Sequence, residues 1–136
     1  MRLSRQTNLT VRVLMYCAVN PGQLSTIPRI AEAYSVSALY LFQILKAIVE
    51  AGFVETVRGR TGGIRLARAA SAITLGDVVR ATEPTLTNRR ETDQAEDVVD
   101  RALQAALDSF TDALGHYTIA DLVDGMPKLR GLLNVA

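Results

Sequence analysis

Apolar side chains recur at helical spacing through the first half of the chain and predict a series of short helices. The first helix spans about residues 3–20 and ends at the helix-breaking sequence Asn20-Pro21-Gly22. The second helix is about two turns long and begins after Ser25 or Thr26, either of which can cap it. Pro28 lies in its first turn, where the missing N–H costs no hydrogen bond.

The third predicted helix follows a break at Ser35-Val36, is capped by Ser37 and ends at Gly52 as a left-handed cap. Its predicted buried stripe consists of Leu41, Ile44, Leu45, Ile48 and Val49. Helical geometry then directs other side chains outward: Leu39, Gln43 and Lys46, with Tyr40 and Phe42 on the flanks.

Two runs of branched and aromatic residues after this helix predict a β-hairpin. They are Phe53–Val57 and Ile64–Ala67, joined by the glycine-rich segment Arg58–Gly63. Two short helices joined by a tight break and followed by a hairpin form a winged helix-turn-helix. The predicted fold class is therefore mainly α, with a small β-hairpin wing.

Capping sequences predict further helices towards the carboxyl terminus. Thr74–Asp77 opens a helix over 75–82, Asp93–Glu96 opens the longest helix over about 95–114, and Thr118–Asp121 opens a short last helix. We expect 1–83 to form a winged helix-turn-helix domain, 84–94 a loop, and 95–136 a dimerisation helix with a short terminal helix.

Composition excludes several classes of function. The 136 residues are 49% hydrophobic and 21% charged, as in a soluble globular domain. A single cysteine, Cys17, and a single histidine, His116, exclude an internal disulfide and a metal site built from several thiolates or histidines of one subunit. No apolar run approaches the ~20 residues of a membrane span, so we expect a cytoplasmic protein. No catalytic constellation and no phosphate-binding glycine loop is recognisable, so the sequence does not favour an enzyme.

The net charge of +1 conceals an uneven distribution. Residues 1–70 carry nine Lys and Arg against three Glu, whereas residues 71–136 carry six Lys and Arg against eleven Asp and Glu. A basic first half favours a polyanionic partner: the third helix suits the major groove of DNA and the arginine-rich wing suits the minor groove. The predicted DNA-binding residues are Ser25, Thr26, Leu39, Tyr40, Phe42, Gln43, Lys46, Arg58, Gly59, Arg60, Thr61, Gly62, Gly63 and Arg65.

The longest helix carries an apolar stripe that the polar segment before it does not cover. A second copy of the helix is the simplest cover, and a two-fold dimer would present two reading helices to one palindromic site. Packing of the stripe on its own domain is the alternative. The predicted dimer-interface residues are Val99, Leu103, Ala106, Leu107, Phe110 and Leu114.

Several segments resemble the Rrf2 family of bacterial transcription regulators. They are Arg2–Asn8, Ile30–Glu32, Val36-Ser37, Ala51–Val54, Val57–Gly63, Leu66–Arg68 and Ile73–Val79. Within the family the chain is most similar to the rhizobial iron regulators, also through Tyr117–Val123. The resemblance implies a homodimeric winged-helix repressor with crossed carboxyl-terminal helices, base contacts from Leu39, Phe42 and Gln43, and minor-groove contact around Arg58.

Two features depart from the family pattern. Ser35 stands where relatives usually have glycine, so we expect a strained or rebuilt turn. Sensing members carry three cysteines between the fourth and fifth helices, and the corresponding segment here, 84–97, contains none. We therefore expect no iron–sulfur cluster held by this segment, and we assign no other cofactor and no metal site.

The sequence thus predicts a homodimeric, sequence-specific regulator that binds double-stranded DNA at a palindromic operator and acts as a repressor. Two alternatives stay open. The winged helix could be a protein-interaction module, for instance an antagonist that forms mixed dimers with a related regulator, because Leu39 and Phe42 face outward. A small molecule or metal could also control DNA binding at the dimer interface, with His116 or Cys17 as candidate ligands.

Overall fold

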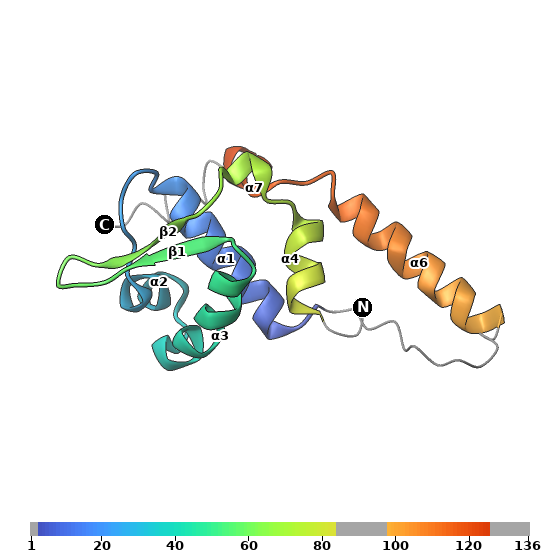
Figure 1. The fold of residues 1–136 in the computed structure, drawn as a ribbon, viewed down its shortest axis with the longest axis horizontal. Coiled ribbons are helices and arrows are strands. Elements are labelled where there is room, and N and C mark those ends of the chain that lie inside the picture. The colour runs from blue at the N-terminus through green and yellow to red at the C-terminus, as the bar shows by residue number, and fades with distance from the viewer. Residues whose placement is uncertain (1–2, 84–97, 126–136) are drawn as a thin grey trace.

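A computed structural model describes residues 3–83 and 98–125 (Figure 1). In chain order the elements are α1 (Arg5–Val19), α2 (Ile27–Tyr34), α3 (Ala38–Glu50), β1 (Val54–Val57), β2 (Gly63–Leu66), the 3-10 helix η1 (Ala70–Ala72), α4 (Leu75–Thr82), α6 (Val98–Leu114) and α7 (Ile119–Asp124). The predicted fold class, mainly α with a small β-hairpin wing, is confirmed. The predictions for 84–97 and 126–136, including the 84–94 loop, lie outside the described residues.

Hydroxyl and carboxylate side chains begin the helices at the positions that the sequence predicts. The Ser37 side chain accepts a hydrogen bond from a backbone amide in the first turn of α3. Thr74 and Asp77 form a complete capping box at the start of α4, and Thr118 and Asp121 form another at the start of α7. These local hydrogen bonds satisfy amides that have no partner within the helix and thereby fix where each helix starts.

The helices α2 and α3 end in left-handed residues of different types. Gly52 has φ +78° after α3, whereas Ser35 has φ +53° after α2. The amide of Val36 donates to the carbonyl of Ala31 at 2.9 Å, the hydrogen bond of a Schellman motif, which favours glycine at its left-handed position. Among the described residues, Ser35 is the one with positive φ that is not a glycine, so the turn is strained. The sequence predicts this strain, because relatives usually have glycine at this position.

The hairpin of β1 and β2 is antiparallel, with register from Val54↔Leu66 to Val57↔Gly63. Ser25, which precedes α2, adds a third strand position, because its amide donates to the Ile64 carbonyl at 2.8 Å and its carbonyl accepts from the Ile64 amide at 2.7 Å. The wing is therefore joined by backbone hydrogen bonds to the start of the helix-turn-helix, which fixes the two relative to each other.

The core surrounds α1, on which α3, α4, α7 and β2 all pack. On α3, Leu41, Ile44 and Ile48 are buried as predicted, whereas Leu45 is only partly buried. Val49 is 36% exposed, so its prediction is wrong. The buried residues recur at intervals of three and four, which leaves Val49 at the edge of the stripe.

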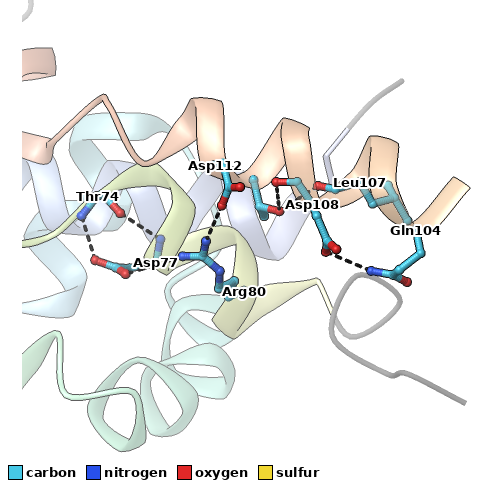
Figure 2. Close-up of polar contacts among 8 residues, drawn as sticks. Thr74, Asp77, Arg80, Gln104, Leu107, Asp108 and Asp112 are labelled. Atoms are coloured by element: carbon cyan, nitrogen blue, oxygen red, sulfur yellow. Dashed lines mark hydrogen bonds and ion pairs between the residues drawn. The ribbon is translucent and has the colours of Figure 1, made fainter. Parts of the chain in front are cut away.

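The helix α6 lies at the opposite end of the molecule from the hairpin and packs on α4 (Figure 1). A Cβ on Gly76 of α4 would lie 2.9 Å from the carbonyl oxygen of Thr111 of α6, so the close approach of the helices depends on this glycine. Figure 2 shows Arg80 of α4 reaching Asp112 of α6, at 3.5 Å.

No single helix in the described parts of the chain has the length and apolar character needed to cross a membrane. The helices α2 and α3 meet that test only when taken together, and they are bent by 119° at the break between them.

Candidate nucleic-acid interface

The outer face of α3 exposes large apolar and polar side chains side by side. Leu39 is 69% exposed and Phe42 is 53% exposed, and Gln43 and Lys46 are exposed as well. Neighbouring exposed side chains of this size and apolar character are typical of a contact surface. The apolar pair suits thymine methyl groups and the amide of Gln43 suits an adenine edge, which are contacts of a helix in a major groove.

Two charged neighbours modify this surface. Lys46 lies 3.9 Å from Glu50, one turn later on α3, but both side chains are mostly exposed and such a pair contributes little. Tyr40 is half-buried, and the guanidinium of Arg5, from the start of α1, lies 4.6 Å from the centre of its ring. Sequence periodicity assigned no role to Arg5, because residues 35 positions apart give no local pattern.

The wing presents its arginines at the tip of the hairpin. Arg58, Gly59, Arg60 and Thr61 are all exposed there. Within the described residues, neither Arg58 nor Arg60 has an ion-pair partner. Their charge is therefore available to a polyanion.

Arg65 differs from the arginines at the tip. Its Nε lies 2.5 Å from a carboxylate oxygen of Glu55, which is directly opposite on β1. Both side chains are about half exposed, so the pair adds little to stability, but it offsets the charge of Arg65. Contact with DNA through Arg65 would compete with this pair.

The three predicted glycines of the wing have requirements within the hairpin itself. A Cβ on Gly62 would lie 2.2 Å from the Val57 carbonyl oxygen, and a Cβ on Gly63 would lie 2.5 Å from the Ser25 carbonyl oxygen. Gly59 has φ +120°, a conformation that other residues rarely adopt. The fold of the hairpin therefore needs these glycines whatever the wing binds.

Ser25 and Thr26, which precede α2, have different surroundings. Thr26 occupies the N-cap position of α2 and is partly exposed, although its side chain makes no capping hydrogen bond. Ser25 is only 4% exposed, and its hydroxyl interacts with the Cys17 thiol. The prediction that Ser25 contacts DNA is wrong for its side chain, because this position is buried under the wing.

The apolar stripe of α6 is divided along its length. Leu107, Phe110 and Leu114 are partly buried, in the half of the helix that packs towards α4. Val99 and Leu103 are each 59% exposed, and Ala106 is exposed too. The alternative of packing on its own domain therefore accounts for the second half of the stripe and leaves the first half open.

Neither of the two candidate ligands, Cys17 and His116, lies in a cluster of metal-binding side chains among the described residues. Burial raises the pKa of the Cys17 thiol to about 12, against an opposing hydrogen bond with Ser25, so the thiol is protonated at neutral pH. His116 is exposed. The described residues contain no group of three or more His, Cys, Asp or Glu side chains that could hold a metal ion.

The two helices, the hairpin and the strand pairing with Ser25 define a winged helix-turn-helix protein. A family model described as "Rrf2: Iron-dependent Transcriptional regulator" matches residues 3–125. The chain belongs to the Rrf2 family of transcription regulators. Among curated proteins, Protein aau3 of Rhizobium meliloti (strain 1021) is 49% identical over 144 residues, which cover 99% of this chain and 93% of that protein.

Solved structures show the same architecture. IscR of T. potens is 26% identical, with a TM-score of 0.77 over 92% of this chain and 88% of that one. The oxidized form of CymR from Staphylococcus aureus is 28% identical, with a TM-score of 0.70 over 90% of this chain and 96% of that one. CymR (YrzC), the global cysteine regulator of B. subtilis, has a TM-score of 0.75 over 91% of this chain and 97% of that one. At 24% identity, this is a likeness of fold alone. The resemblance to Rrf2 regulators is thus confirmed at the level of the family.

Proposed function

We propose that this chain is a homodimeric transcription regulator that binds double-stranded DNA sequence-specifically through α3 and the wing. One observation carries the proposal: Leu39, Phe42 and Gln43 are exposed on α3 of a helix-turn-helix, and the attached hairpin ends in Arg58 and Arg60, which form no ion pair with the described residues. An exposed helix supplies base contacts and an arginine-tipped hairpin supplies phosphate and minor-groove contacts.

Selection of bound sequences from a random DNA pool with purified protein tests this proposal. We expect an enriched palindromic site. Affinity for that site, measured by fluorescence anisotropy, should fall steeply as the salt concentration rises. Gln43→Ala should relax preference at one position of each half-site by about 1–3 kcal/mol, and Arg58→Ala should weaken binding. Arg80→Gln is the matched control, because it removes the same charge on α4, where Arg80 pairs with Asp112. A pool with no enriched site would refute sequence-specific binding.

We propose that two copies associate through the stripe of α6. The exposed Val99 and Leu103 of this stripe support the proposal, since large apolar side chains that are each 59% exposed favour a partner surface. Leu103→Asp should yield monomers in sedimentation velocity. Ala105→Asp puts the same charge on the other side of α6, at another exposed position, and should remain dimeric. Equal sedimentation of wild type and Leu103→Asp would refute this interface.

We propose repression as the regulatory outcome, because a dimer seated across a promoter blocks access to it. In vitro transcription from a template that carries the selected site should fall as protein is added. The alternative is a protein-interaction module built on the same exposed Leu39 and Phe42. A stable mixed dimer with a related regulator, together with an unenriched DNA pool, would favour that alternative.

We propose that the protein works without an iron–sulfur cluster, although its sequence resembles the rhizobial iron regulators. A cluster needs several thiolates, whereas the whole chain has one cysteine, and that thiol is buried and protonated. That resemblance rests on the sequence segments given above. Protein purified without oxygen should be colourless above 320 nm and free of stoichiometric iron and sulfide.

A further inference from the structure

The first turn of α1 carries a positive charge to the edge of the reading helix. Arg5 is exposed, and its guanidinium lies 4.6 Å from the centre of the Tyr40 ring on α3. This distance is that of a cation–π contact, which restricts the arginine side chain without neutralising it. Arg5 makes no ion pair with any residue in 3–83 or 98–125. Its contact with Tyr40 places the Arg5 guanidinium against the first turn of α3.

The backbone that carries Arg5 is held by a cluster of polar side chains from both ends of the winged domain. One carboxylate oxygen of Glu83, which follows α4, accepts hydrogen bonds from the Ser4 amide and the Thr7 hydroxyl, each at 2.7 Å. The Thr7 hydroxyl also lies 2.6 Å from that of Thr82, and the Ser4 hydroxyl caps the amide of Thr7. A carboxylate at the amino terminus of a helix is favourable with the helix dipole.

We propose that Arg5 is a phosphate-binding residue of the DNA interface, positioned by Tyr40 and by the Glu83 carboxylate that anchors the first turn of α1. This inference rests on the proposed DNA-binding function. Guanidinium groups bind phosphate through planar, paired hydrogen bonds, and a stacked arginine loses less side-chain freedom when it binds. The duplex backbone flanks the groove that a reading helix enters, so a cation at the edge of α3 that forms no ion pair with the described residues is suited to meet it.

Arg12 provides a matched control on the same helix. It too is exposed, and its guanidinium lies 5.9 Å from the centre of a tyrosine ring, that of Tyr34. The Tyr34 hydroxyl donates to the Arg12 carbonyl at 3.0 Å. Arg12 is two turns further along α1 and stacks against the end of α2 rather than against α3. Removing Arg12 therefore subtracts the same charge without touching the edge of the reading helix.

The test compares Arg5→Ala with Arg12→Ala in salt titrations of the full chain on the selected duplex and on a random duplex. Each lost phosphate contact lowers the slope of log K against log salt by about 0.9, which is about eightfold in affinity per copy at 0.1 M salt. We expect this loss for Arg5→Ala on both duplexes, with sequence preference unchanged, and a much smaller loss for Arg12→Ala. An unchanged slope for Arg5→Ala, or equal losses for both variants, would overturn the inference. A wild type that binds no DNA overturns the proposed function as well.

Glu83→Gln tests the positioning role through the sign of its effect. It removes a negative charge, so long-range electrostatics alone would strengthen DNA binding. If the carboxylate positions Arg5, binding should instead weaken by roughly two- to fivefold, because an amide oxygen is the weaker acceptor for the Ser4 and Thr7 donors. The salt slope should stay near the wild-type value, since the arginine is still present. Binding equal to or tighter than wild type would overturn the positioning role.

Discussion

Two threonines of α1 allow a test in which the same chemical change has opposite consequences. Thr7 and Thr10 lie one turn apart and are both fully buried. The Thr7 hydroxyl has three oxygen neighbours, on Ser4, Thr82 and Glu83. The Thr10 hydroxyl has no hydrogen-bond partner among the described residues. Replacing either by valine exchanges a hydroxyl for a methyl group of similar size.

The magnitudes follow from the cost of unpaired polar groups. A buried hydroxyl without a partner costs about 1–3 kcal/mol, so Thr10→Val should stabilise the fold by roughly 1–2 kcal/mol. Thr7→Val removes a donor to a carboxylate and leaves Thr82 with one partner fewer, which should cost roughly 1.5–3 kcal/mol. The two variants should thus differ in free energy of unfolding by roughly 2.5–5 kcal/mol, with opposite signs relative to wild type.

Urea unfolding followed by far-ultraviolet circular dichroism measures both changes. Protein concentration must be the same for all variants, because association shifts apparent stability. Destabilisation by Thr10→Val comparable to that of Thr7→Val would refute the assignment of the unpaired hydroxyl. It would mean that Thr10 finds a partner in the folded protein.

Three further predictions concern strain, reactivity and pH. Ser35→Gly should raise the free energy of unfolding, measured with urea, by about 0.5–1 kcal/mol. Gly52→Ser, in an equivalent turn with open space around it, should lower the free energy of unfolding by about 1–2 kcal/mol. Changes of the same sign in the two variants would contradict the assignment of strain to Ser35. Because burial raises the pKa of Cys17 to about 12, iodoacetamide at pH 8 should alkylate the native thiol roughly three orders of magnitude more slowly than the unfolded one, as mass spectrometry would measure. Hydrogen bonds from Thr7 and Ser4 lower the pKa of Glu83 in the folded protein. The ionised carboxylate should therefore stabilise the fold above pH ~4.3, and this contribution should be lost as the pH falls through the pKa of Glu83 in the folded state. The urea midpoints of wild type and Glu83→Gln should accordingly converge in acid.

Short-range signals made most of the elements predictable. A cap such as Thr74 with Asp77, or a stop such as Gly52, depends on residues within one turn, so its meaning does not change with the rest of the fold. The predicted boundaries of α4, 75–82, agree with the structure for this reason. The outward side of α3 was predictable as well, because its buried stripe has a clear helical period.

Contacts set by strand register were not predictable in the same way. The predicted hairpin begins its second strand at Ile64, whereas the structure pairs Val57 with Gly63. That pairing puts Glu55 opposite Arg65 and produces the ion pair that offsets one of the predicted DNA-binding charges. A shift of one residue in register would separate them, and nothing in the local sequence fixes the register across a turn of this length. The burial of Ser25 has the same origin, because it follows from pairing with Ile64.

The arginines and the glycines of the wing have different roles. A Cβ atom on Gly62 or Gly63 would lie too close to a backbone carbonyl oxygen, so the hairpin requires these glycines even without DNA. Arg58 and Arg60 project from the tip with no structural partner among the described residues, so the hairpin does not require them. A regulator of this fold can therefore change or lose its wing contacts by substituting the arginines alone while the glycines stay. In this chain we therefore expect substitutions of Arg58 and Arg60 to affect binding, and substitutions of Gly62 and Gly63 to affect folding.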